Sequence, residues 1–360
     1  MTNESSTPET ADEVTADESP VAAVATSSTD LQDAETQGFR DDYERIRDAV
    51  GSVIVGQHRV IDSVLTAMFC GGNVLLEGVP GLGKTELVKS LARVLDLDFR
   101  RIQFTPDLMP ADIIGTNIMN TDESGRYQFE FRRGPIFTQL LLADEINRAS
   151  PKTQSALLET MQEGTVTVGG EVFVLKQPFF VLATQNPIEQ EGTYPLPEAQ
   201  LDRFMFMIKV DYPSEEEEFQ IMKTYTGNEA GKPDPVLTAE EILEMQRAVR
   251  NMPVADHIIR YAEKLVRVTR PNSEEALEFC TKWLTWGAGP RAGLNLVLAA
   301  KAHALLKGES HVSCDDIAAV APPIFRHRII PNFSAQSEGL TPDDITAKIL
   351  ESVPKDKKLD

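Results

Sequence analysis

The segment Gly78-Val-Pro-Gly-Leu-Gly-Lys-Thr85 constrains this chain more than any other feature. It fits the pattern GxxxxGK[ST], follows an apolar stretch of strand length and precedes a stretch with helical periodicity. In such a loop, backbone N–H groups surround phosphate, the lysine reaches the β- and γ-phosphates and the threonine hydroxyl meets Mg²⁺. A glycine-rich turn without a ligand fits this context less well. The predicted phosphate-binding residues are Gly78, Val79, Pro80, Gly81, Leu82, Gly83, Lys84, Thr85 and Glu86.

An acidic pair forms the candidate metal and water site. Asp144 and Glu145 directly follow the apolar stretch 140–143, and strand ends of a parallel sheet converge on the ligand. We predict that Asp144 holds Mg²⁺ together with Thr85, and that Glu145 polarises the water that attacks the γ-phosphate. The alternative is an ordinary solvated strand exit. The phosphate loop alone leaves kinases, GTPases, helicases and ATPases open, but the chain contains no Asn-Lys-x-Asp sequence to read guanine, which favours adenine.

Three further polar residues occupy positions from which they could act on a nucleotide. Asn186 follows another apolar stretch and could bind the attacking water, although Asn-Pro also simply makes turns. Arg203 starts the last apolar stretch and could serve a neighbouring subunit, with a surface ion pair as the alternative. Arg291 lies in the first turn of a predicted helix, where a cation opposes the helix dipole. Its partner is therefore either a nucleotide phosphate or an acidic neighbour.

Five apolar stretches of strand length, with helical stretches between several of them, predict an α/β fold: a parallel five-stranded sheet with helices on both faces. They cover residues 73–77, 99–104, 140–143, 179–183 and 204–210. Hairpin-like segments at 122–131 and 165–175 interrupt this alternation. After Pro213 only amphipathic helical stretches follow. We expect a disordered acidic tail over residues 1–38, a nucleotide-binding domain over 39–212 and a smaller all-α domain over 213–360.

The charge and composition limit the partners. The formal net charge is −21, and residues 1–38 hold nine acids and no Lys or Arg. Such an acidic surface repels phosphate backbones, so we do not expect nucleic-acid binding. No apolar run approaches the roughly 18 residues of a membrane helix. The N-terminus also lacks the pattern of a secretory signal, so we predict a cytoplasmic protein. The three cysteines lie far apart, which argues against disulfides or a zinc site.

Together, these motifs resemble the AAA+ superfamily and, within it, the MoxR family. The resemblance spans roughly residues 39–353 and also rests on segments 55–57, 103–112, 144–149, 155–163, 184–187, 191–204, 287–292 and 326–328. It implies that Val55, Gly56 and Gln57 lie against the adenine of ATP or ADP. It also implies that the two hairpins are the helix-2 and pre-sensor-1 inserts, and that the helical domain is the lid. The catalytic residues that it implies are Lys84, Glu145 of Walker B, Asn186 as sensor 1, Arg203 as arginine finger and Arg291 as sensor 2.

The resemblance also carries expectations about assembly and partners. AAA+ proteins of this type usually form hexameric rings with each ATP between two subunits. MoxR relatives are thought to be chaperone-like ATPases that mature or activate partner proteins, often ones with von Willebrand factor A domains, in some cases by inserting a cofactor or metal. Two alternatives stay open: a nucleotide-gated adaptor without productive turnover, and a motor similar to the chelatases and helicases.

Overall fold

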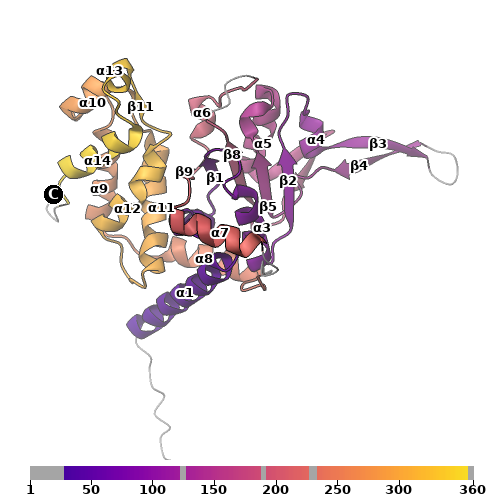
Figure 1. Cartoon of the computed structure of the whole chain (residues 1–360), viewed down its shortest axis with the longest axis horizontal. Coiled ribbons are helices and arrows are strands. Elements are labelled where there is room, and N and C mark those ends of the chain that lie inside the picture. The colour runs from indigo at the N-terminus through magenta and orange to yellow at the C-terminus, as the bar shows by residue number, and fades with distance from the viewer. Residues whose placement is uncertain (1–27, 122–126, 188–191, 227–232, 356–360) are drawn as a thin grey trace, which may run out of the picture.

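A computed structural model describes the chain over residues 28–121, 127–187, 192–226 and 233–355. An α/β domain lies beside a helical domain, and a long hairpin projects from the α/β domain on the side away from the helices (Figure 1). No helix in these described ranges is long and apolar enough to cross a membrane.

The five predicted strands form one parallel sheet in the order β2-β5-β8-β1-β9, which confirms the predicted fold class. Strands β5 and β8 are buried over nearly their whole length because both faces of the sheet are covered. This explains why their sequences are continuous apolar runs. The strands are β1 (Val74–Glu77), β2 (Phe99–Gln103), β5 (Leu140–Asp144), β8 (Phe180–Gln185) and β9 (Phe206–Lys209).

Successive side chains of the sheet enter two hydrophobic cores on opposite faces. Val74 and Leu76 of β1 belong to the larger core, and Leu75 belongs to the smaller one. The larger core continues without interruption into the helical domain, so that domain and one face of the sheet share a single apolar interior. Helices of the α/β domain are α1 (Ser28–Gly51), α2 (His58–Phe69) and α3 (Lys84–Val94) on the larger core, then α4 (Pro110–Ile114), η1 (Ile146–Arg148) and α5 (Pro151–Glu163) on the smaller one, and α6 (Glu198–Leu201).

Two antiparallel hairpins are inserted between the core strands, as predicted. The first joins β3 (Gly115–Thr121) to β4 (Tyr127–Arg133), and its predicted turn at 122–125 lies outside the described residues. The second joins β6 (Thr165–Val168) to β7 (Glu171–Val174) through two glycines with positive φ. Phe131 and Phe173 bring the hairpins together at their bases, with 4.6 Å between ring centroids.

The described residues of the second domain are helical, apart from one short antiparallel sheet that the sequence did not predict, β10 (Leu284–Trp286) with β11 (Ile330–Pro331). Strands of two or three residues are too short to show an alternating pattern. The helices from residue 213 onward are α7 (Glu215–Thr226), α8 (Ala239–Asn251), α9 (Asp256–Arg267), α10 (Glu278–Trp283), α11 (Pro290–Leu306), α12 (Cys314–Phe325), α13 (Phe333–Ser337) and α14 (Pro342–Ser352).

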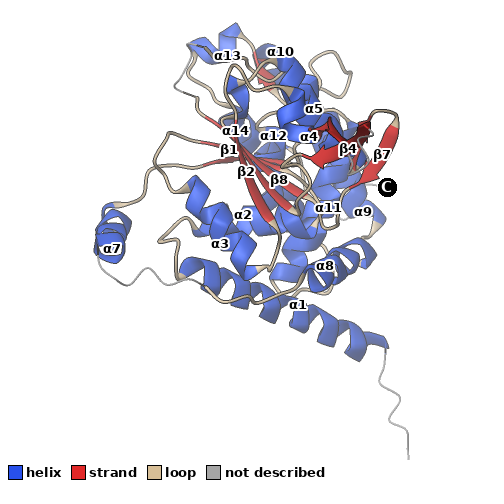
Figure 2. Ribbon diagram, turned by 90° about the vertical axis from the view of Figure 1, so that its right-hand side faces the viewer, coloured by secondary structure: helices blue, strands red, loops and turns tan. Residues whose placement is uncertain are grey.

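The predicted disordered tail is wrong for residues 28–38, because helix α1 already begins at Ser28. Its second half is anchored by the buried side chains of Phe39, Tyr43 and Ile46, and α1 lies along the outer side of α2 and α3 (Figure 2). A helix that is nucleated by packing extends at little cost into neighbouring residues. Composition alone, which treats the segment in isolation, misses this effect. Residues 1–27 lie outside the described ranges.

Candidate nucleotide site

The glycine-rich loop joins the end of β1 to the start of α3, as the motif predicts. Gly81 and Gly83 have φ of +85° and +74°, a conformation that favours glycine, and a Cβ at either position would meet open space. Gly83 is the N-cap residue of α3, and at this cap no side chain accepts a hydrogen bond from the N–H groups of the first turn. The first N–H groups of the helix are therefore available to an anion, as expected for a phosphate loop.

Lys84 is the first residue of α3, and Thr85 follows it. The Lys84 ammonium donates to the carbonyl oxygen of Gly78 and so bridges the loop. Burial lowers the pKa of Lys84, while the negative charges of Asp144, Glu145 and Glu77 oppose that shift. Both predicted acidic residues are thus within electrostatic reach of the lysine.

Asp144 is the last residue of β5 and is largely buried. Its Oδ1 accepts from the hydroxyl of Thr184 at 2.6 Å, and its Oδ2 accepts from Arg101 Nε at 3.0 Å. The same Thr184 oxygen accepts from the backbone N–H of Glu145 at 2.8 Å. One hydroxyl on β8 therefore fixes both members of the acidic pair.

Glu145 turns the chain at the strand end, since its φ of 56° and ψ of 50° are left-handed values that are uncommon for a residue with a side chain. Its Oε2 accepts from Gln103 Nε2 at 2.9 Å and from Arg148 Nη1 at 3.2 Å. Gln103 ends the neighbouring strand β2 and is in register with Asp144. The unusual backbone thus directs the carboxylate along the edge of the sheet on which the strands end.

Asn186 lies one residue beyond β8 and is 5% exposed. Strand β8 pairs with β5 on one side and with β1 on the other. Asn186 therefore lies between the acidic pair and the phosphate loop, at the edge where the sequence prediction put it.

A pocket of about 560 Å³ opens beside the loop. Val55 and Gln57 line it together with Pro80, Gly81, Leu82, Gly83 and Glu86. Gln57 Nε2 donates to the Leu82 carbonyl at 3.0 Å, whereas the buried Oε1 has no hydrogen-bond partner within the described part of the chain. Gly56 has φ of +70°, and a Cβ there would come within 2.2 Å of Glu217 in α7.

The far wall of this pocket comes from α7 and from Tyr212 and Pro213 shortly before it, which the sequence did not predict. Tyr212, Pro213, Ile221, Met222 and Tyr225 line the pocket. The Tyr225 hydroxyl also donates to the Val53 carbonyl at 2.9 Å and fastens the helix to the segment before Val55.

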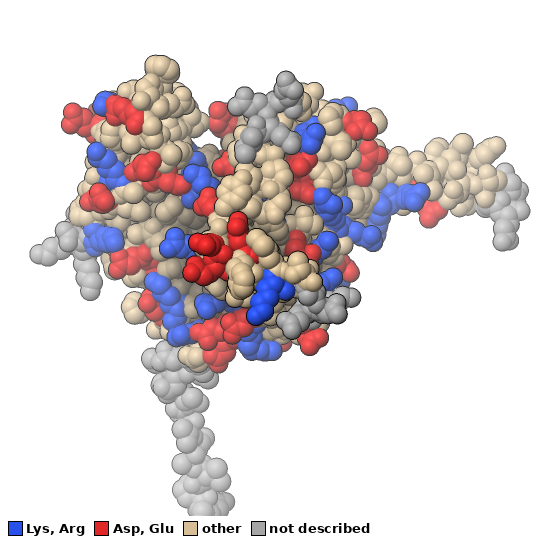
Figure 3. All heavy atoms as spheres, in the orientation of Figure 1, with Lys and Arg blue, Asp and Glu red and all other residues tan. Residues whose placement is uncertain are grey.

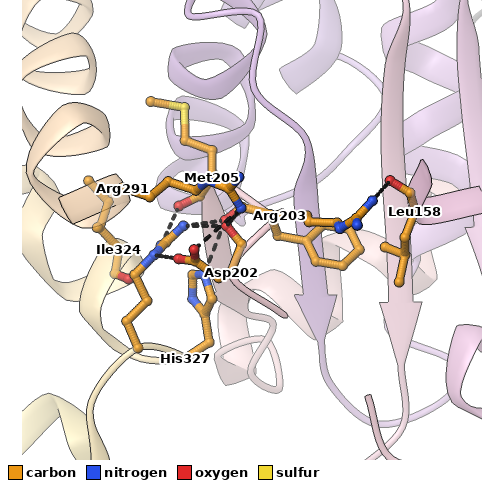
Figure 4. A network of polar contacts seen from close by, with 9 residues as sticks. Leu158, Asp202, Arg203, Met205, Arg291, Ile324 and His327 are labelled. Carbon is orange, nitrogen blue, oxygen red and sulfur yellow. Dashed lines mark hydrogen bonds and ion pairs between the residues drawn. The ribbon is translucent and has the colours of Figure 1, made fainter. Parts of the chain in front are cut away.

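Arg203 and Arg291 line a different pocket, of about 320 Å³, together with Asn73. Asn73 immediately precedes β1, whereas the phosphate loop immediately follows it. At about 3.3 Å per residue, the length of this strand separates the two arginines from the loop of their own chain. Arg203 Nη1 donates to the Leu158 carbonyl at 2.6 Å, and Arg291 pairs with Asp202 at 3.3 Å (Figure 4). An acidic neighbour, the alternative left open for Arg291, is therefore present.

Comparisons with known proteins decide the family. The chain is 43% identical over 310 residues to the chaperone MoxR1 of Mycobacterium tuberculosis, an alignment that covers 86% of this chain and 81% of that protein. The chain belongs to the MoxR family of AAA+ ATPases. It is also 44% identical over 308 residues to YeaC of Bacillus subtilis, covering 84% and 92% of the two chains.

The domain matches agree with this MoxR-family assignment. Residues 73–206 match the ATPase family associated with various cellular activities, and residues 280–349 match the AAA lid domain. The crystal structure of a proposed ATPase from Cytophaga hutchinsonii superimposes with a TM-score of 0.84 at 43% identity, covering 92% of this chain and all of that one. As a member of this family, the chain is a nucleotide-binding protein.

Sequence reasoning gave no role to Arg101, Gln103 and Thr184, which hold the acidic pair. A signal for two of them existed: Arg101 and Gln103 alternate on the strand next to Asp144, so their side chains share one face of the sheet. Thr184 gave no such signal, because a threonine inside an apolar strand is usual. The roles proposed for the other site residues stay predictions.

Proposed function

We propose that this MoxR-family chain hydrolyses ATP to ADP and phosphate with Mg²⁺. The observation that carries the proposal is that the glycine loop with Lys84 follows β1 and the pair Asp144–Glu145 stands at the end of β5, at the same edge of the parallel sheet with only β8 between the two strands. Glu145 is the base that polarises the attacking water, and Asn186 orients that water. When bound, Mg²⁺ would supply positive charge opposite the β- and γ-phosphate oxygens.

The residues present fit both ATP and Mg²⁺. The open glycine positions 81 and 83 leave room for phosphate oxygens. Gln57 Oε1, which no described residue pairs with, is an acceptor suited to the amino group of adenine. Thr85 and Asp144 offer the hard oxygen ligands that Mg²⁺ prefers, with the phosphates and water completing its shell. In this structure Arg101 occupies Asp144 Oδ2, so the metal would share or displace that contact.

We further propose that each ATP lies between two subunits. Arg203 and Arg291 lie at the opposite end of the sheet from the loop of their own chain, so they are better located to serve the nucleotide of a neighbour. A contact that joins the loop end of one subunit to the arginine end of the next is heterologous, and such contacts form a ring when the rotation between subunits closes. A hexamer is the ring expected from the family.

The proposed clients are proteins, in agreement with the chaperone name of the MoxR1 relative. Met119, Tyr127 and Phe129 lie on one face of the β3–β4 hairpin and are 59%, 72% and 77% exposed. An exposed apolar strip suits contact with a polypeptide. Domains of the von Willebrand factor A type are the clients that the family suggests, with maturation or metal insertion as the outcome.

Nucleic acid fits this surface less well. Lys and Arg are interspersed with Asp and Glu over most of the face drawn in Figure 3, and the chain carries a net charge of −21. A motor that acts on DNA would instead need a local basic track. Stimulation of phosphate release by DNA at physiological salt would favour that alternative.

The variant Glu145→Gln tests the proposed chemistry. It keeps the shape of the side chain but removes the base, so phosphate release should fall by at least about 10²-fold while ATP still binds. Glu351→Gln, which changes an exposed lid glutamate, is the matched control and should behave as wild type. Wild-type turnover in Glu145→Gln would refute the role of Glu145. A wild-type chain that binds ATP but releases no phosphate would support the adaptor instead.

A further inference from the structure

Arg328 is the most densely bonded arginine at the junction of lid and sheet. It follows α12, is 5% exposed and donates to the side chain of Asp202 at 2.7 Å. It also donates to four backbone carbonyl oxygens, those of Asp202, Phe204, Met205 and Ile324, at 2.7–3.1 Å. Burial lowers the pKa of Arg328 to about 10 and Asp202 opposes that shift, so the guanidinium stays charged at neutral pH.

Three of the four carbonyl acceptors lie on the segment that carries Arg203. The carbonyls of Asp202 and Phe204 belong to the residues directly before and after Arg203. A planar guanidinium with donors in a fixed fork holds several acceptors in one geometry, which a flexible ammonium does not. Arg328 therefore fixes the backbone on both sides of Arg203 relative to the lid.

The same network includes Arg291. Oδ1 of Asp202 accepts from Arg328, and Oδ2 of the same carboxylate accepts from Arg291 Nη1 at 3.3 Å (Figure 4). Asp202 precedes Arg203 directly in the chain, whereas Arg291 is the second residue of α11 of the lid. One buried arginine and one carboxylate thus join Arg291 of the lid to the backbone around Arg203, whose own guanidinium donates to the Leu158 carbonyl.

We propose that Arg328 is a positioning residue that, through Asp202, holds Arg203 and Arg291 as one unit facing the nucleotide of the adjacent subunit. This inference rests on the proposed function, in which both arginines act across the subunit contact. Its consequence is that a movement of the lid carries Arg203 with it. Arg328 itself touches no nucleotide and acts only through the segment that it holds.

The test compares Arg328→Lys and Asp202→Asn with a control at the same domain junction. Asp343→Asn removes the ion pairs with Lys209 of β9 and with Arg326, at 3.1 and 3.0 Å, but leaves Asp202 untouched. We expect Arg328→Lys and Asp202→Asn to lower kcat for phosphate release about 10-fold or more, with unchanged affinity for ADP. Asp343→Asn should stay within about twofold of wild type, because it disturbs the lid without reaching the arginine segment.

Mixing variant subunits distinguishes a positioning role of Arg328 from a general loss of folding. Arg328→Lys subunits keep intact phosphate loops, so adding Lys84→Ala subunits, which keep intact arginines, should restore turnover at mixed contacts. Absence of rescue, unchanged kcat in Arg328→Lys, or an equal loss in Asp343→Asn would overturn the inference.

A wild-type chain that releases no phosphate would refute the proposed ATPase but not this inference. The same variants are then compared in the Glu145→Gln background by ATP-dependent assembly in sedimentation velocity. Arg328→Lys should weaken that assembly relative to Asp343→Asn, and equal assembly would refute the positioning role.

Discussion

The two ends of the β-sheet are built differently. At the end where the strands finish, a glycine loop from one contiguous segment faces polar residues delivered by adjacent strands, and a pocket remains open beside it. At the end where they begin, Asp202 accepts from both Arg291 and Arg328 of the lid, and Arg328 also holds the backbone on either side of Arg203. The first end is preformed for binding, whereas the second has its arginines fixed by the lid.

The strongest way to break this comparison is to inactivate each end in a separate subunit. Arg203→Ala should lower turnover about 10³-fold without loss of ATP binding. Lys84→Ala should abolish ATP binding. Phosphate release from each variant alone and from mixtures gives the measurement. In a ring assembled at random from equal amounts of the two variants, about a quarter of contacts pair an intact loop with an intact arginine. Turnover should therefore return to about a quarter of the wild-type value. Mixtures no more active than their components would contradict a division of labour between the ends.

A single methyl group tests how tightly the loop end is fitted. A Cβ at Gly78 would come within 2.6 Å of the Val210 carbonyl oxygen, a backbone atom that does not yield easily. Gly78→Ala should lower the free energy of unfolding by about 1–3 kcal/mol and weaken ATP binding. Thermal unfolding and nucleotide titration measure the two effects.

Gly293→Ala is the control for that change, at the arginine end. A Cβ added at Gly293 would lie 3.8 Å from a methyl group of Val266, which is an ordinary van der Waals contact. The residue lies within α11. It should leave binding unchanged and stabilise the protein by about 0.5–1 kcal/mol. If Gly78→Ala and Gly293→Ala lowered the free energy of unfolding equally, the loop end would not be more tightly fitted than the arginine end.

A pH dependence of stability is expected from a buried histidine at the arginine end. Burial, together with the charge of Arg328, lowers the pKa of His327 well below its ordinary value, while the Phe204 carbonyl opposes the shift. The unfolded chain therefore takes up a proton before the folded one, and stability is lost as pH falls below about 6.5, by up to about 1.4 kcal/mol per pH unit. His327→Gln should reduce that slope in urea unfolding between pH 7 and 5. His58→Gln, at an exposed position beside the loop end, is the control variant.

Much of the loop end could be predicted, because its residues are local in sequence or stand at strand ends that any parallel sheet brings together. Gly78–Thr85, Asp144 and Asn186 needed only the alternation of strands and helices. Helix α7 over the pocket needed the fold, since no pattern in its sequence relates it to a loop more than a hundred residues earlier. The start of α1 at Ser28 likewise depends on packing that composition does not show.

The sequence by itself determined that this chain has a phosphate loop, an acidic strand end and a parallel sheet, because motif spacing and apolar periodicity are properties of short segments. Only the tertiary structure decided which side chains meet them. Strand register brings Arg101 to Asp144. Packing of the lid brings Arg291 to Asp202, and it brings Arg328 to the backbone around Arg203. Such contacts depend on how whole helices and strands pack against each other, and no short sequence pattern specifies that packing.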